Sequence, residues 1–235
     1  MLRPCLIPIA AAFLAAPPLS AQDLASICTT ATHPPVGAWA EYQYTGGQQA
    51  GSTMRVAAVG SEARGDTTML WIELAMRAPS PGGDSGVNAT IPVIAKLLVP
   101  AWGSGMTRPR ASVMKYGSAP AMQMPADQGA GPGGEGPDLL DNCRASQIVG
   151  WEQVVAPDGS YRALHVRSAA GDEDVWLAPG LAFGVVKDSS GGSGEASGVI
   201  LSRHGMGATS QITEQPRPYD PAILMQLFAP KPKGP

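Results

Sequence analysis

Acidic side chains close to tryptophans are the residues of this sequence whose types and spacing could do chemistry. Glu41, Glu73 and Asp174 each lie two positions from a tryptophan, in segments that alternate apolar and polar residues. Because successive side chains of a strand point to opposite faces, each carboxylate would share a face with its tryptophan. Paired carboxylates can act as a general acid and a general base, so these three residues define a hydrolase alternative. Carboxylates along a solvated sheet face also serve simply to keep the sheet soluble.

Two further motifs have the residue types of a site without its context. Gly83-Asp84-Ser85-Gly86 resembles the nucleophile segment of trypsin-like serine proteases, but His33 lies too close before Ser85 for a barrel to fit between them. The glycines at 129, 131 and 134 match a dinucleotide fingerprint, but neither a strand before them nor a helix after them is expected. We therefore expect no catalytic residue of these types and no bound cofactor.

Metal ligands are sparse. His33, His165 and His204 show no zinc-binding spacing, so we expect no metal site. Four methionines are clustered in the middle of the chain: Met106, Met114, Met122 and Met124. Thioethers select Cu(I) outside the cytoplasm, but methionine is equally a filler of irregular cores. Copper therefore stays open as an alternative.

The first 21 residues have the composition of a secretory signal. A basic start at Arg3 precedes an apolar run over residues 6–16. Small residues follow up to Ala21, and we expect a signal peptidase to cleave between Ala21 and Gln22. This run is shorter than the roughly 20 residues that span a bilayer. We expect a periplasmic or secreted protein with no transmembrane segment in its mature chain.

Two cysteines remain once Cys5 leaves with the signal. In an oxidising compartment, Cys28 and Cys143 are expected to form a disulfide that joins the N-terminal segment to the middle of the chain. Closing so long a loop is worth about 4–5 kcal/mol in the chain-entropy model. Lipidation of Cys28 is rejected, because Ile27 places a bulky side chain where a small one is required.

The composition indicates a globular protein rich in turns. Of 235 residues only 15% are charged, while 29 are glycine and 23 are proline. This mixture is too apolar for a disordered chain and too rich in turn-forming residues for a helical protein. The formal net charge of −3 comes without a basic patch, so the charge gives no support for nucleic-acid binding.

Alternating apolar and polar positions predict about ten strands and little helix. The predicted strands are 36–45, 52–59, 67–77, 87–99, 111–116, 148–155, 161–168, 174–177, 182–187 and 198–204. Short helices are expected at 139–148 and 221–229. The fold class is mainly β, with a single antiparallel sheet forming an open half-barrel and one or two short helices.

The organisation expected along the chain has four parts. They are a signal peptide at 1–21, a leader at 22–35, a β-rich domain at 36–214 and a C-terminal segment at 215–235. The domain contains a long Gly/Pro loop at 117–138, and the last segment combines a short helix with a disordered tail.

Alternation also gives the sheet two different faces. One face is apolar and includes Leu70, Ile72, Leu74 and Met76. The other combines Trp39, Trp71 and Trp176 with charged residues such as Arg55 and Arg167. Tryptophan usually finds a partner for its indole N–H, so either a covering strap or a ligand-binding aromatic surface fits this second face.

Several phrases resemble known secreted proteins. Gly37-Ala-Trp39-Ala-Glu41-Tyr42 and Trp71-Ile-Glu73 resemble a group of uncharacterised secreted bacterial proteins. The phrases at 161–165, 175–179, 184–187 and 205–210 look like the closing strands of periplasmic carriers related to LolA and LolB. The resemblance implies an incomplete antiparallel barrel, lidded by helices, that shelters the acyl chains of lipoproteins. This chain has room for fewer lid helices than those carriers.

We therefore expect a non-catalytic, monomeric protein that binds a lipid, a lipoprotein or another envelope component in or on a curved sheet. The alternative is a structural or interaction module of the cell envelope without a small ligand. The candidate ligand-binding residues are Trp39, Trp71, Trp176, Met76, Leu74, Arg55 and Arg167, the arginines contacting a polar head. Met76 lies opposite the tryptophans, so the two faces cannot line one cavity. If the apolar face is the cavity wall, Leu70, Ile72, Leu74 and Met76 line it instead.

Overall fold

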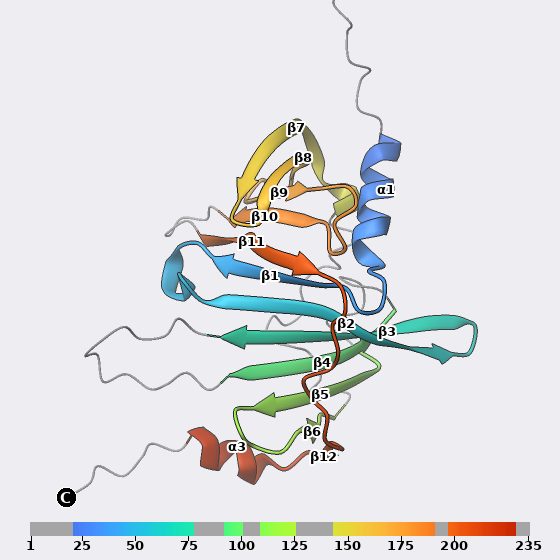
Figure 1. Cartoon of the computed structure of the whole chain (residues 1–235), viewed down its shortest axis with the longest axis vertical. Coiled ribbons are helices and arrows are strands. Elements are labelled where there is room, and N and C mark those ends of the chain that lie inside the picture. Colours follow the sequence, from blue (N-terminus) through green and yellow to red (C-terminus); the bar gives the residue numbers. More distant parts are fainter. Residues whose placement is uncertain (1–20, 78–91, 101–108, 126–142, 191–196, 229–235) are drawn as a thin grey trace, which may run out of the picture.

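One large curved sheet organises the chain (Figure 1). The computed structural model describes residues 21–77, 92–100, 109–125, 143–190 and 197–228. Within them the strands follow the order β12-β6-β5-β4-β3-β2-β1-β11-β10-β9-β8-β7. The two ends of this order do not pair with each other, so the sheet is open, as predicted. It is mixed rather than wholly antiparallel, because β12 runs parallel to β6.

The first half of the chain builds an antiparallel meander. Its elements are β1 (Trp39–Tyr44), η1 (Gly47–Gln49), β2 (Thr53–Arg64), β3 (Thr67–Arg77), β4 (Val93–Val99), β5 (Ala111–Tyr116) and β6 (Met122–Gln123). Each of these strands pairs with the next. The meander therefore extends from the middle of the sheet to β6, one strand from the edge.

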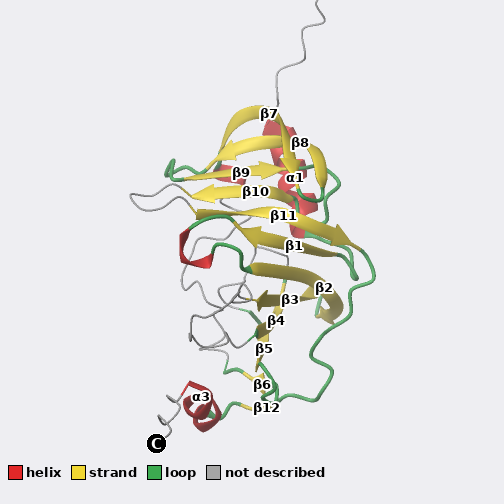
Figure 2. Cartoon of the chain, turned by 60° about the vertical axis from the view of Figure 1, so that its left-hand side comes forward, coloured by secondary structure: helices red, strands yellow, loops and turns green. Residues whose placement is uncertain are grey.

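The second half builds a second meander that ends beside the first. Its strands are β7 (Gln147–Ala156), β8 (Gly159–Arg167), β9 (Glu173–Leu177), β10 (Val185–Ser190) and β11 (Ser197–Gly205). Strand β11 pairs with β1, which joins the two meanders into one sheet. Residues 206–216, here called the strap, then cross the sheet to β12 (Arg217–Pro218) and helix α3 (Pro221–Phe228), as Figure 2 shows.

The main core lies on the apolar face of the first meander. It is formed by side chains of β1–β4, of β7–β11 and of the β9–β10 connection. Its larger members are Tyr42, Val56, Leu70, Ile72, Leu97, Val99, Val154, Trp176, Phe183, Val186 and Leu201. Phe183 and Ile72 are 1% and 0% exposed. The predicted apolar side of the early strands is thus the core side.

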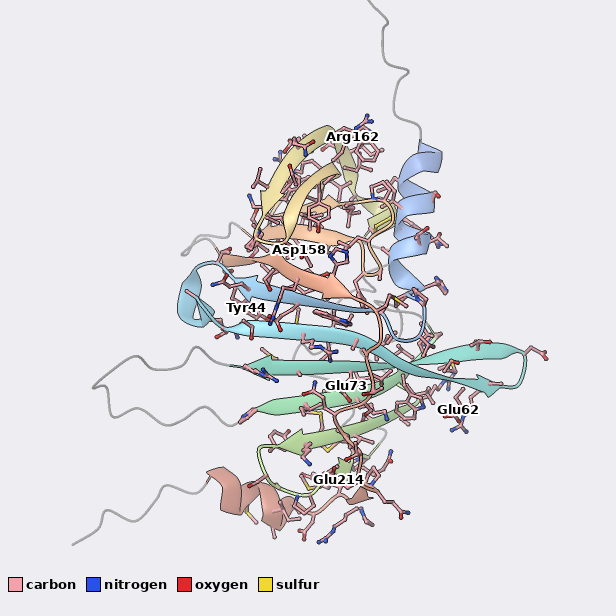
Figure 3. The ribbon with its side chains drawn as sticks, in the orientation of Figure 1. Tyr44, Glu62, Glu73, Asp158, Arg162 and Glu214 are labelled. Carbon is pink, nitrogen blue, oxygen red and sulfur yellow. A yellow bond between two sulfur atoms is a disulfide. The ribbon has the colours of Figure 1, made fainter. Side chains whose placement is uncertain are left out.

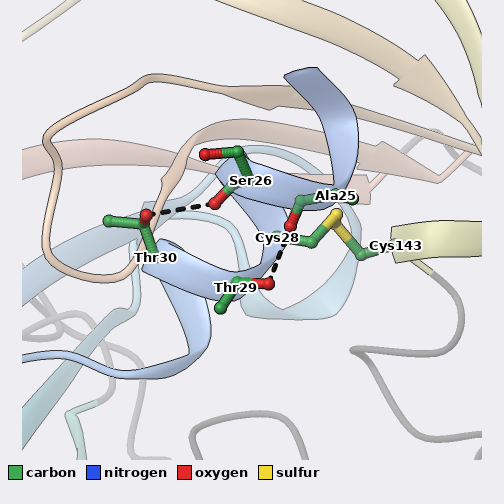
Figure 4. The surroundings of a disulfide bond; sticks show 6 residues. All are labelled: Ala25, Ser26, Cys28, Thr29, Thr30 and Cys143. Atoms are coloured by element: carbon green, nitrogen blue, oxygen red, sulfur yellow. Dashed lines mark hydrogen bonds between the residues drawn. A yellow bond between two sulfur atoms is a disulfide. The ribbon is translucent and has the colours of Figure 1, made fainter. Parts of the chain in front are cut away.

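Helix α1 (Ala21–Thr32) occupies much of the segment 22–35, which the sequence analysis interpreted as a leader. The helix was therefore not predicted. Its buried side chains recur at helical spacing, at Leu24, Ile27, Cys28 and Ala31. They form a second core with Leu164, Val166 and Leu177 of β8 and β9. On the exposed side, hydroxyls of Thr29 and Thr30 donate to carbonyls one turn back (Figure 4).

The predicted disulfide is confirmed. Cys28 of α1 is bonded to Cys143, which lies just before β7, across a sequence separation of 115 residues (Figure 4). Cys28 is fully buried in the second core. The bond therefore fastens α1 to the end of the sheet that it packs against.

Several boundaries differ from the sequence prediction. Strand β2 does not end at Val59 but continues through Gly60 to Arg64, because a bulge between Ala58 and Gly60 absorbs the glycine. The described part of the 117–138 loop contains strand β6, which pairs with β5. Strand β7 already begins at Gln147, so the helix predicted at 139–148 ends too late. The remainder of that loop and Lys231–Pro235 lie outside the described residues.

Candidate functional site

The strap covers the tryptophan-bearing face of the first meander. Glu73, 1% exposed, accepts hydrogen bonds from the Ser210 hydroxyl at 2.8 Å and from the Gln211 backbone N–H at 3.0 Å. Ile212 packs beside Val113, and Glu214 forms an ion pair with Lys115. Figure 3 labels Glu73, on the sheet beside this segment, and Glu214, which is part of it. Glu73 is therefore an internal anchor for the strap.

Each of the four tryptophans that the structure describes lies against a cation from the adjacent strand. Ring-centroid distances are 5.3 Å for Arg55 on Trp39, 5.2 Å for Lys96 on Trp71, 5.0 Å for Arg162 on Trp151 and 4.4 Å for Lys187 on Trp176. Such contacts stabilise by about 0.5–1 kcal/mol when exposed. Sequence reasoning placed Arg55 on the tryptophan face but paired the tryptophans with carboxylates of their own strands. It missed the pairing of each ring with a cation, which follows only from the strand register.

The indole N–H groups also have partners. Trp39 donates to the Met206 carbonyl at 3.3 Å, and Trp71 donates to Glu62 at 3.3 Å. Trp39 and Trp71 are thus held by the strap and by neighbouring strands, and Arg55 is engaged at Trp39. For the tryptophan-bearing face, the alternatives were a covering strap and a ligand-binding aromatic surface. The structure has the covering strap.

Trp176 and Arg167 belong to a separate polar network on β7–β10. The Trp176 N–H donates to Glu152 at 2.7 Å, and its ring stacks on His165 at 4.3 Å. Both His165 ring nitrogens lie within hydrogen-bond distance of carboxylates, at 2.8 Å from Glu152 and 2.7 Å from Asp174. The pKa of Glu152 is lowered, mainly by the bond from Trp176, and the pKa of Asp174 is lowered, mainly by the bond from Arg167. The network joins four strands electrostatically.

The three carboxylates of the hydrolase alternative are not brought together. Glu73 binds the strap, and Glu41 on β1 forms an ion pair with Arg203 at 2.7 Å. Asp174 lies on β9, which β10 and β11 separate from β1. Each carboxylate has its own partner on a different part of the sheet, so these three residues do not form an acid–base pair.

The methionine cluster is divided. Met114 and Met122 are buried opposite one another on β5 and β6, so they fill the core there. Met106 lies outside the described residues, as does Ser85. Among the described histidines, cysteines and acidic residues, no group of three is arranged to hold a metal ion.

A cavity of about 650 Å³ opens at the apolar face, where β1, β2, β10 and β11 meet η1. Its lining residues are Tyr44, Gly46, Gly47, Gln49, Met54, Asp188, Ser190, Ser197, Gly198 and Val199. Tyr44, Val199 and Asp188 are consecutive cross-strand partners, so they point to the same side. The Tyr44 hydroxyl also lies 3.8 Å from the Met54 sulfur.

Leu74 and Met76 continue this surface onto β3. Met54 is paired with Met76, and Val56 is paired with Leu74. Leu74, Met76, Met54 and Tyr44 are all only partly buried, in contrast to Ile72 deeper in the core. Of the predicted ligand-binding residues, Leu74 and Met76 thus lie on the cavity's side of the sheet, whereas Trp39, Trp71 and Arg55 lie on the strap side.

The polar side of the cavity was not predicted from the sequence. Asp188 is half-buried, and burial together with the adjacent Glu173 carboxylate raises its pKa to about 7. Burial and the Asp188 charge also raise the pKa of Tyr44. Ser190 and Ser197 are 3.0 Å apart and hydrogen-bond to each other. No sequence signal marks Asp188, because its burial depends on strands distant in the chain.

Comparison with known proteins finds similarity only among solved structures. No protein-family model matches the chain, and no curated protein matches it. A candidate lipoprotein from Parabacteroides distasonis is 12% identical, with a TM-score of 0.37, over 75% of this chain and 98% of that one. A candidate exported protein with a YmcC-like fold from Bacteroides fragilis is 12% identical, with a TM-score of 0.35, over 74% and 98%.

The solved structures that resemble the chain also include a LolA superfamily protein from Nitrosomonas europaea. It is 10% identical, with a TM-score of 0.21, over 82% of this chain and 96% of that one. Likenesses this weak do not bear on function.

The disulfide bears on where the protein works. Disulfide bonds form and persist in the periplasm and outside the cell, and cytosolic reductants keep most thiols reduced. The Cys28–Cys143 bond therefore agrees with the predicted address, and the protein is periplasmic or secreted. None of the described helices is both long and apolar enough to span a membrane.

Proposed function

We propose that this protein binds the apolar chain of a lipid, or of a lipid-modified protein, in the cavity at Tyr44, Met54 and Val199. The observation that carries the proposal is the cavity itself, whose volume of about 650 Å³ falls within the range of ligand pockets. Partly buried Leu74 and Met76 extend the apolar surface beyond the cavity along β3. A chain bound in this way would shield side chains that water now contacts.

The two faces of the sheet differ in what already covers them. On the strap side, Glu73 is closed over by Ser210 and Gln211. On the cavity side, Tyr44 and Met54 are partly exposed around an open volume. The apolar face is therefore the better candidate for binding, with Leu74 and Met76 as its contacts, and the tryptophans stabilise the sheet.

Binding of the neutral apolar dye N-phenyl-1-naphthylamine tests the proposal. We expect fluorescence enhancement with the native protein and a loss of at least tenfold in affinity for Met54→Trp and Val199→Trp, which fill the cavity. The matched control is Val155→Trp, because Val155 is 76% exposed on β7 and lies outside the cavity. Equal dye binding by all four proteins would contradict the proposal.

The alternative of an interaction module has one observation in its favour. Strand β7 ends the sheet order, and its side chains Val149 and Val155 are 50% and 76% exposed. Edge strands of this kind can pair with another chain. A protein that binds no dye but elutes as a dimer, and returns to a monomer on Val155→Lys substitution, would favour this alternative.

A further inference from the structure

The cavity is chemically asymmetric. Tyr44, Met54 and Val199 provide an apolar floor, while Asp188, Ser190 and Ser197 provide a polar wall. Asp188 is the one charged residue that lines the cavity within the described part of the chain, and no lysine or arginine there does so. An amphiphile placed in the cavity would therefore have its polar end next to a carboxylate.

The groups around Asp188 make this wall acidic. Glu173 on β9 disfavours the ionised form of Asp188, both by its charge and by hydrogen-bonding to the protonated carboxyl. Tyr44 on β1 presents a phenol whose pKa the Asp188 charge helps to raise. Lys187, the neighbour of Asp188 in the chain, points to the opposite face of β10, where its ammonium lies 4.4 Å from the Trp176 ring centroid. Strand β11 contributes Ser197 and Val199, which carry no charge.

An apolar floor beside an unneutralised carboxylate favours one class of ligand. We propose that the cavity selects amphiphiles with a cationic amine head, a selectivity that rests on the proposed function. The ammonium contacts Asp188, and the chain lies on Met54 and Val199. An ammonium donates up to three hydrogen bonds, and Asp188 and the Ser190 hydroxyl can accept them. A fatty-acid carboxylate at the same position would be repelled by Asp188 and Glu173.

The selection carries its own pH dependence. Because the pKa of Asp188 is about 7 in the empty cavity, much of this group is protonated below that pH. An ammonium stabilises the ionised form, so amine binding near pH 7 releases part of a proton and tightens as the pH rises from 5.5 to 8. Binding of an uncharged amphiphile with the same chain releases no proton.

Isothermal titration of the full chain with decylamine, decanoate and decanol tests the inference. At pH 8 we expect decylamine to bind at least tenfold more tightly than decanoate, and this preference to shrink at pH 5.5. Heats measured in two buffers of different ionisation enthalpy report the released proton. Asp188→Asn should abolish the preference and the proton release while decanol binding persists. Asp66→Asn, in the exposed β2–β3 turn, is the matched control.

The outcomes separate the two proposals. Equal binding of decylamine and decanoate by the native protein, with decanol binding retained, would overturn the amine selectivity and leave chain binding standing. Absence of binding by all three amphiphiles would overturn both. The native protein's own preference and pH dependence remain decisive if Asp188→Asn proves unstable.

Discussion

Replacing Glu73 tests whether this carboxylate anchors the strap or serves chemistry. In Glu73→Leu the part-buried Gln211 backbone N–H loses its acceptor, which costs about 1–3 kcal/mol. The Ser210 hydroxyl keeps its bond to the Ile212 carbonyl and loses about 1 kcal/mol. We therefore expect the free energy of unfolding to fall by about 2–4 kcal/mol in total.

Urea unfolding followed by tryptophan fluorescence measures this change. Glu41→Leu is the matched control, since Glu41 forms an ion pair with the 67%-exposed Arg203 side chain, and such solvent-screened pairs contribute little to stability. Glu73→Gln keeps a carbonyl acceptor and should fall between the two. A Glu73→Leu protein as stable as the Glu41→Leu protein would refute the anchoring role.

Three further predictions concern stability. Gly184→Ala should destabilise by about 1–3 kcal/mol more than Gly180→Ala in urea unfolding, because both glycines have positive φ but only at Gly184 does an added methyl meet Ala31 of α1; equal effects would contradict the packing of α1. Reducing the disulfide should lower stability by up to about 4–5 kcal/mol, and the Cys28→Ser/Cys143→Ser protein should not respond to reductant. Folding lowers the pKa values of Glu152, Asp158 and Asp174. These carboxylates therefore stabilise the folded protein fully above their ordinary pKa, and this contribution is lost as the pH falls through their pKa values in the folded protein. The urea concentration at the unfolding midpoint should therefore decrease as the pH falls below about 4.5. It should decrease less in Trp176→Phe, which removes the principal hydrogen bond to Glu152. This pH profile is best measured in the Asp188→Asn background, because the raised pKa of Asp188 acts in the opposite direction and costs stability as the pH rises toward 7. If Trp176→Phe loses stability below about pH 4.5 as steeply as its parent, the result would count against the network.

Local patterning was enough to find most of the sheet. The segments 67–77 and 111–116 were predicted with the bounds that β3 and β5 have, because alternation and flanking turn residues are both strong there. The disulfide followed from cysteine number and compartment alone. Helix α1 was missed although Leu24, Ile27, Cys28 and Ala31 show helical spacing, because the short segment was interpreted as a leader.

The site depended on contacts that a single sequence does not reveal. The cavity exists because β11 returns to pair with β1 and brings Val199 beside Tyr44. The raised pKa of Asp188 likewise requires burial and Glu173 from the neighbouring strand. Alternation placed Leu74 and Met76 on the apolar face, but only the position of the strap distinguishes the covered face from the one with a cavity.

Native mass spectrometry of the protein purified from its own compartment tests the central claim most directly. We predict a bound species with the mass of an acyl-chain amphiphile that disappears on organic extraction and is absent from Met54→Trp. A bare, oxidised chain in both proteins, before and after extraction, would contradict the account.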